Sequence, residues 1–271
     1  MASLPILLDP ARLEEHLGDS GLLVVDLSRA EHYARHHVPG AVHLDYARLI
    51  ASRQPVMGLL PPAAALATLF GELGITPDTH VVACDDEGGG KAGRLLWTLD
   101  AMGHGAWSLL DGGLHAWAAE GHPLDSQPVE PRPAAPYPVQ ENPAVIATAE
   151  ELLQRLGDPQ LGLLDARSEA EYIGAKAFAA RAGHIPGAVN FEWTEAMQRH
   201  NNLRLRPLEE LRAELAGLGL TPDREIVSYC QTHHRSSHSY VMLKALGYER
   251  IKGYPGSWSD WGNRSDTPIE T

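Results

Sequence analysis

The sequence predicts an α/β protein of two similar domains, each a mainly parallel sheet covered by helices on both faces. Two observations lead to this prediction. An internal duplication covers nearly the whole chain, and each copy alternates short apolar runs with helical patterns. The length of 271 residues agrees, because a single hydrophobic core usually stops growing below that size.

The duplication consists of segments that recur in the same order. In both copies an Asp ends an apolar run and a Tyr follows it by seven residues, as Asp26 with Tyr33 and Asp165 with Tyr172. The other matching pairs are His37–Val42 with His184–Val189, and Gly74–Asp78 with Gly219–Asp223. Ordered matches of this kind indicate a tandem repeat.

A proline-rich stretch separates the copies. It holds Pro128, Pro131, Pro133, Pro136, Pro138 and Pro143, which disfavours a helix or a central strand and is typical of an extended linker. We therefore predict a first domain over residues 1–123, a linker over 124–145 and a second domain over 146–271.

The apolar patterns place the main elements of each copy. Buried strands are predicted at Leu22–Val25, Val81–Ala83, Leu161–Leu164 and Ile226–Val227. Helical stripes facing the core are predicted for Leu66, Leu69, Phe70 and Leu73, and for Leu208, Leu211, Leu215 and Leu218. Thr148 followed by Glu151 matches a capping box and predicts the first helix of the second domain.

Composition excludes several classes of protein. The formal charge of −13 disfavours binding to nucleic acid or to an anionic membrane surface. No apolar run is long enough to span a bilayer, and the first residues lack a basic leader, so a cytoplasmic location is expected. Two cysteines cannot make a disulfide framework. Two fused copies can bury against each other the surface that separate subunits would share, which favours a monomer.

Cys230 is the candidate nucleophile. It follows the predicted strand Ile226–Val227 and precedes a helical pattern, so a loop there can wrap its N–H groups around the sulfur while the helix directs its positive end toward it. We call residues 230–236 the cradle. Its remaining members are Gln231, Thr232, His233, His234, Arg235 and Ser236. Nearby basic side chains favour the reactive thiolate.

The first copy serves as an internal control. Counting from Gly74 and Gly219, Asp85 occupies the position of Cys230, and Cys84 matches the last strand residue. An acidic loop there would repel an anionic substrate. We therefore predict a non-catalytic first domain with Cys84 as a buried structural residue.

These motifs resemble the two-domain rhodaneses, sulfurtransferases in which only the C-terminal copy is active. The resemblance covers essentially the whole chain. It is carried by Asp165, the segment 183–189, the cradle, and the terminal Gly256-Ser257-Trp258 with Trp261. The cradle is similar to that of bacterial thiosulfate:cyanide enzymes and departs from the Cys-Gly-Ser-Gly-Val-Thr pattern of mercaptopyruvate-using relatives. Glu171 and Thr232 stand where eukaryotic thiosulfate enzymes carry basic residues.

The resemblance implies a chemistry without a bound cofactor. The Cys230 thiolate would take the sulfane sulfur of thiosulfate as a persulfide and pass it to cyanide or a thiol acceptor. Backbone N–H groups from Thr232 to Ser236 would stabilise the persulfide charge, and Arg235 would attract the donor. Sulfur-trafficking proteins are possible partners. Ser236 is expected to precede the next helix and cap it.

Other readings stay open. A cysteine phosphatase or arsenate reductase also uses a Cys cradle ending in Arg, although here the cradle is one residue shorter than the usual Cys-x5-Arg. A zinc site formed by Cys230, His233, His234 and His238 is a second alternative. A sulfur carrier for cofactor or iron–sulfur assembly and a non-catalytic binding module are others.

Six further side chains are weighed outside the cradle. Asp165 either orients the site or ties down its own loop, and His184 is expected to anchor a loop. Trp258 is interpreted, like Trp193, as a packing or pocket-wall residue. The extension Ala175–Ala182, absent from the first copy, carries Lys176 and Arg181, which would add positive potential at the pocket mouth.

Overall fold

The computed structural model describes residues 4–271, which form two compact units. The first unit holds residues 4–49, 61–142 and 197–205, and the second holds Ile50–Leu60, Pro143–Ala196 and Arg206–Thr271. Each unit thus includes a short segment that the repeat boundary assigns to the other copy. Residues 124–142 contain no helix and no strand beyond an isolated bridge between Asp125 and His37.

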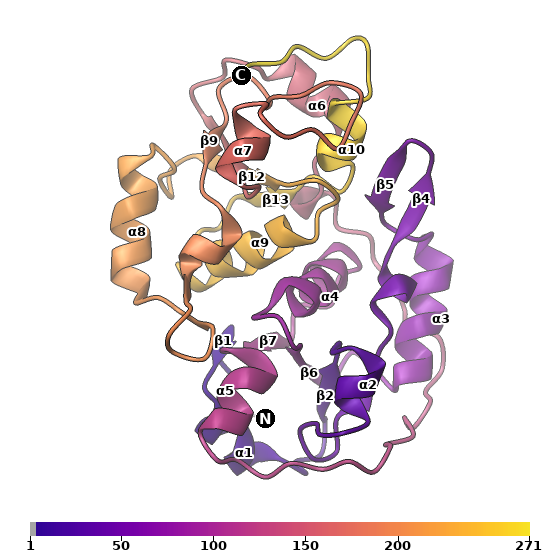
Figure 1. Cartoon of the computed structure of the whole chain (residues 1–271). Helices are drawn as coiled ribbons and strands as arrows, with labels where there is room; N and C mark the ends of the chain where they lie inside the picture. The colour runs from indigo at the N-terminus through magenta and orange to yellow at the C-terminus, as the bar shows by residue number, and fades with distance from the viewer. Residues whose placement is uncertain (1–3) are drawn as a thin grey trace. The chain divides into compact units, whose positions relative to one another are not determined.

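The first unit is built on a five-stranded sheet with the order β1-β7-β6-β2-β3, and all of its strand pairs are parallel (Figure 1). The strands of this unit are β1 (Leu7–Leu8), β2 (Leu22–Asp26), β3 (Val42–His43), β6 (His80–Cys84), β7 (Trp107–Leu110) and the short antiparallel pair β10 (Met197–Gln198) and β11 (Arg204–Leu205). Its helices are α1 (Pro10–His16), α2 (Ala30–Tyr33), α3 (Ala63–Leu73), α4 (Gly90–Ala101) and α5 (Gly113–Ala119), with a 3-10 turn at Tyr46–Leu49.

The second unit repeats this plan with a four-stranded parallel sheet in the order β13-β12-β8-β9. The strands are β8 (Leu161–Asp165), β9 (Val189–Asn190), β12 (Glu225–Tyr229), β13 (Ile251–Gly253) and the antiparallel hairpin β4 (Ala51–Arg53) and β5 (Val56–Leu59). The helices are α6 (Ala149–Gln154), α7 (Glu169–Tyr172), α8 (Leu208–Gly217), α9 (Arg235–Ala245) and α10 (Ser257–Trp261), with 3-10 turns at Pro143–Val145 and Trp193–Ala196.

The predicted fold class is confirmed, and each predicted strand is present within a residue or two of its expected limits. Thr148 caps α6 by accepting the N–H of Glu151. The predicted stripe on α3 is buried. The prediction for Leu218 was wrong: α8 ends at Gly217, so Leu218 leaves the helical period and is 37% exposed.

A histidine-tyrosine pair explains why one motif occurs in both copies. His37 stacks on Tyr33 in the first unit, and His184 stacks on Tyr172 in the second, with ring centroids 4.0 and 3.7 Å apart. Each His Nδ1 also bonds the main-chain oxygen of its Tyr. His184 therefore anchors a loop, as expected. No helix within residues 4–271 is long and apolar enough to cross a membrane.

Candidate active site

Cys230 lies where the sequence placed it, at the carboxyl end of a central parallel strand. β12 ends at Tyr229 and α9 begins at Arg235, so residues 230–234 of the cradle connect the two elements, and Arg235 and Ser236 open the helix. Ligands of open α/β sheets gather at this edge. The Cys230 residue is only 1% exposed, so its ionisation depends on the groups packed around it.

Those groups favour the thiolate. Burial by itself raises the pKa of the Cys230 thiol, but the charge of Arg235 acts against it. Hydrogen bonds from the Ser236 hydroxyl and from the backbone of Ser236 and Thr232 act in the same direction as Arg235. The net result lowers the pKa of Cys230 from 9.0 to about 7, so roughly half of the molecules carry a thiolate near neutral pH.

Arg235 is held by Glu171 on α7. Its two terminal nitrogens donate to the two carboxylate oxygens of Glu171 at 2.7 and 2.9 Å. These bonds, although burial opposes them, lower the pKa of Glu171 to about 2. Because both terminal nitrogens of Arg235 are bonded to Glu171, Arg235 can attract the donor through its positive charge and not through these two N–H groups. The sequence signal that involves Glu171 is a capping box with Ser168, which marks the start of α7 but not the contact with Arg235.

Two details of the cradle differ from the sequence interpretation. Ser236 does not precede α9 but is its second residue, and its hydroxyl bonds His233 Nδ1 at 2.7 Å. The N–H of His233, expected to face the sulfur, instead donates to Ser257 Oγ at 3.1 Å. The reason is a left-handed backbone at His233, with φ of 53°, which turns that N–H away.

The remaining cradle side chains are spread around the loop. Gln231 Nε2 donates to the main-chain oxygen of Phe178. His234 and His238 pack near the ring of Trp193, whereas His233 turns toward Ser236. Within residues 4–271 no group of His, Cys, Asp or Glu side chains is arranged to hold a metal ion.

Asp165 acts through a neighbour that the sequence interpretation missed. Its buried carboxylate accepts from the backbone N–H and the guanidinium of Arg167. Arg167 also donates to Gly183 O and lies over the ring of Trp258, 4.5 Å from the centroid. Asp165 therefore ties down the loop after β8, and Trp258 packs behind the cradle.

Arg181 is bound by main-chain groups near the C-terminus. Its guanidinium donates to the main-chain oxygens of Thr267 and Trp261, so it fastens the extension Ala175–Ala182 to the C-terminal segment. Lys176 lies over the ring of Phe178. The positive potential expected from Lys176 and Arg181 stays a prediction.

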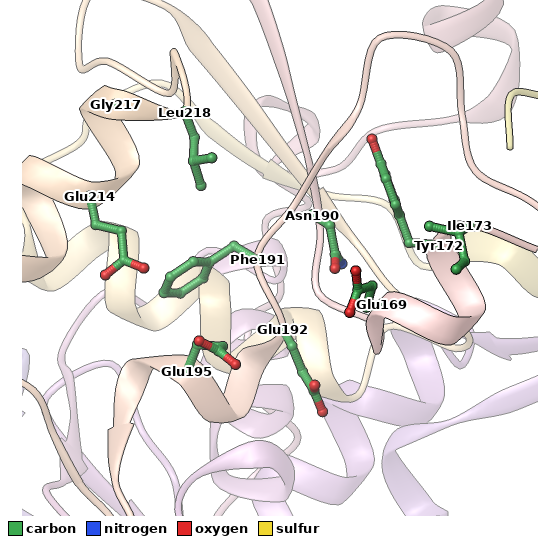
Figure 2. A pocket seen from close by; sticks show the side chains of 10 residues that line it. All are labelled: Glu169, Tyr172, Ile173, Asn190, Phe191, Glu192, Glu195, Glu214, Gly217 and Leu218. Atoms are coloured by element: carbon green, nitrogen blue, oxygen red, sulfur yellow. The ribbon is translucent and has the colours of Figure 1, made fainter.

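A pocket of about 480 Å³ in the second unit is lined in part by α7 and the residue after it (Figure 2). Cys230 does not line it. Its lining residues are Glu169, Tyr172, Ile173, Asn190, Phe191, Glu192, Glu195, Glu214, Gly217 and Leu218. Four carboxylates around one cavity repel anions, so this pocket does not suit a dianionic donor.

The loop of the first unit that matches the cradle is closed by its own side chain. The carboxylate of the buried Asp85 accepts the N–H groups of Glu87, Gly89 and Ala92 at 2.8–3.0 Å. Burial, followed by the charge of Glu87, raises the pKa of Asp85. Cys84 is fully buried, and burial raises the pKa of its thiol well above 9.0. The N–H groups of this loop are thus already bonded by the carboxylate of Asp85.

The rhodanese-like domain model matches the chain twice, over residues 9–120 and 148–264. The chain belongs to the rhodanese family. A thiosulfate sulfurtransferase of Azotobacter vinelandii is 49% identical over 269 residues, which cover 99% of this chain and 98% of the relative. The predictions of a tandem rhodanese and of a sulfurtransferase are thereby confirmed.

Two other comparisons give a further relative and a similar fold. The sulfur carrier protein TtuD of Thermus thermophilus is 34% identical over 270 residues, covering 95% of this chain and 93% of TtuD. The solved structure of an anaerobic ergothioneine biosynthesis enzyme from Chlorobium limicola matches with a TM-score of 0.87 at 23% identity, covering 98% of this chain and 70% of that one. The latter similarity shows the fold alone.

Proposed function

We propose that this rhodanese transfers the sulfane sulfur of thiosulfate through a persulfide on Cys230 to cyanide or another thiophilic acceptor. The observation that carries the proposal is a buried thiol whose pKa the cradle and Arg235 lower to about 7. The full-length similarity to a thiosulfate sulfurtransferase supports the choice of donor.

The two half-reactions balance without a cofactor or an added oxidant. The Cys230 thiolate attacks the outer sulfur of thiosulfate, the sulfur–sulfur bond of the donor breaks, and its electron pair leaves on sulfite. The terminal sulfur of the persulfide then carries the negative charge. Cyanide attacks that sulfur, the bond to Cys230 breaks, and thiocyanate leaves with the thiolate restored.

The cradle supplies what both half-reactions need. The terminal persulfide charge and the starting thiolate are both anions beside the same N–H groups, so groups fixed for one also suit the other. Arg235 contributes positive charge to both states. Because Glu171 holds its guanidinium, Arg235 keeps a fixed distance from the sulfur instead of moving with the substrate.

The same ion pair disfavours a phosphatase. Phosphate binding by an Arg at the end of a Cys loop uses the two-pronged guanidinium, and here Glu171 occupies it. Assay with an aryl phosphate tests this alternative, and we expect no turnover.

Sulfur carriage to another protein is a second candidate, favoured by the similarity to TtuD. It uses the same persulfide and differs in the acceptor. Comparing rates of sulfur release to cyanide, to a dithiol and to a protein thiol separates the two. The monomeric state and cytoplasmic location stay predictions from the sequence.

Mass spectrometry after thiosulfate treatment tests the proposal directly. We expect one added sulfur atom on the peptide that contains Cys230, lost again on addition of cyanide. An unmodified Cys230 peptide from folded protein would refute the persulfide route.

A further inference from the structure

Helix α10 binds two carbonyl groups of the cradle backbone. The N–H groups of Trp258 and Ser259 donate to the main-chain oxygens of Cys230 and Gln231 at 2.9 and 3.0 Å. In a trans peptide the C=O and the following N–H point in opposite directions. The N–H groups of Gln231 and Thr232 therefore point away from α10, and that of Thr232 bonds the sulfur of Cys230.

Ser257 holds two more backbone groups of the cradle. Its Oγ accepts the N–H of Cys230 at 3.2 Å and that of His233 at 3.1 Å, and it donates to Tyr254 O at 2.7 Å. Ser257 is fully buried and has a φ of 50°, close to the 53° of His233. Non-glycine residues keep this conformation only where the surroundings fix it. The hydroxyl group of one residue with a left-handed backbone, Ser257, thus binds the N–H of another, His233.

Gly58 on β5 covers the same loop from another side. Its φ is +75°, and a Cβ added there would lie 2.1 Å from the main-chain oxygen of Thr232. That oxygen belongs to the peptide whose N–H, on His233, is bound to Ser257. One peptide plane of the cradle is therefore held at both ends, by Gly58 and by Ser257.

The hairpin that carries Gly58 is fastened to α10. Ser259 Oγ accepts the N–H of Met57 at 3.0 Å and lies 3.0 Å from Met57 O and 2.8 Å from Gly256 O. Figure 1 shows β5 beside α10, although the hairpin precedes the second repeat by many residues. It belongs to the same compact unit as Cys230.

We propose that the hairpin Ala51–Leu59 and the first turn of α10 form a positioning clamp that fixes the cradle backbone so that the N–H of Thr232 points at the sulfur of Cys230, with Gly58 and Ser257 as positioning residues. Neither residue touches the reacting atoms. Each fixes a peptide plane of the cradle. The clamp gives a segment of the first repeat a role in the chemistry of the second, and this role rests on the proposed function of Cys230.

The experiment measures the ionisation of Cys230 in Ser257→Ala and Gly58→Ala. Ser257→Ala keeps the Cβ and removes only the hydroxyl, whereas Gly58→Ala pushes on Thr232. The rate of iodoacetamide labelling of Cys230 is followed against pH by peptide mass spectrometry, with kcat for thiosulfate measured in parallel. A pKa rise of one unit from about 7 lowers the thiolate fraction at pH 7 about 5-fold, and we expect at least that loss of labelling.

Gly247→Ala is the matched control, because Gly247 is exposed, has a φ of +83° and has open space where a Cβ would stand. It carries the same backbone strain without pressing on the cradle, so its labelling profile stays that of the wild type. Melting temperatures identify variants that fold. Should Gly58→Ala fail to fold, Ser257→Ala carries the test alone.

Wild-type labelling profiles in the folded clamp variants would overturn the proposal. So would a lowered melting temperature with an unchanged pKa of Cys230, because that result assigns the contacts to stability alone. Labelling needs no thiosulfate. A failure of the persulfide route is therefore seen separately, as a wild-type protein that labels at Cys230 but takes up no sulfur.

Discussion

Arg235 and Glu171 face each other through two parallel hydrogen bonds of 2.7 and 2.9 Å, with the carboxylate side chain only 4% exposed. Parallel N–H to oxygen bonds of this kind fix orientation as well as charge. One end of the pair therefore stays beside Cys230, and the other is fastened to α7. The residue that seemed a departure from the family pattern is the one that positions Arg235.

Glu171→Gln tests the contribution of this pair to stability. The pKa of Glu171 is about 2 in the folded protein and 4.5 ordinarily, so the carboxylate stabilises the fold above about pH 4.5, and this contribution is lost as the pH falls toward 2. We expect the variant to lose about 2 kcal/mol at pH 7 and a smaller amount at pH 4. Urea unfolding at the two pH values measures the difference.

Glu169→Gln is the control for that substitution, since Glu169 lies on the same helix and is exposed. It should change the unfolding free energy by less than about 0.5 kcal/mol. An equal loss in the Glu171 variant at both pH values would mean that the ion pair is not the source of the stability.

Arg235→Gln should raise the pKa of Cys230 above 7. The charge of Arg235 acts against burial in setting that pKa, and the neutral amide leaves burial less opposed. The pH at which labelling of Cys230 reaches half its maximum should move upward, with at least about 5-fold slower labelling at pH 7. Labelling with iodoacetamide, quenched at fixed times from pH 5 to 10, measures this shift.

Arg250→Gln, an exposed arginine of the same unit, is the comparison for Arg235→Gln. It also removes one positive charge, so a general effect of net charge would appear in both variants. A shift confined to the Arg235 variant assigns the effect to proximity, and equal shifts would contradict it.

The sequence predicted the repeat, the strands and the place of Cys230 because these depend on local patterns. Apolar runs of the right length mark buried strands, and prolines mark the linker. A cysteine directly after a central strand lies at the edge of the sheet whatever the rest of the chain does. The position of Leu218 was predicted wrongly because a helical stripe does not show where its helix ends.

The contacts that complete the site have no local pattern. Ser257 is 27 residues from Cys230, and Met57 is 202 residues from Ser259. The sequence showed Ser257 only as part of a terminal motif, and no local pattern shows its contact with Cys230 or that of Gly58 with Thr232. Arg167 was missed for a related reason, because a charged residue after a strand is usually exposed, whereas here Asp165 and the ring of Trp258 bury it.

Asp85→Asn should weaken the first unit without altering Cys230. Three N–H groups point at the two carboxylate oxygens of Asp85, and an amide places its own donor against at least one of them. A buried donor left unsatisfied costs about 1–3 kcal/mol. Urea unfolding measures the loss, and labelling of Cys230 should keep its wild-type pH profile.

Asp78→Asn supplies the reference for this loss, because Asp78 is exposed in the same unit, and its substitution should change stability by less than about 0.5 kcal/mol. If Asp85→Asn were as stable as the wild type, its carboxylate would not be what satisfies the loop. A shifted labelling profile of Cys230 would show that the loop acts beyond its own unit.

Cys230→Ser should lower steady-state transfer from thiosulfate to cyanide by at least about 10⁴-fold, since a hydroxyl stays protonated at neutral pH and forms no persulfide. Thiocyanate formation measures the rate. Cys84→Ala removes the other thiol, which is buried and has a raised pKa, and should retain activity in its folded fraction. Because the two variants each leave one thiol, their comparison assigns the sulfur-carrying position without any probe of structure, and turnover in Cys230→Ser would place the chemistry elsewhere.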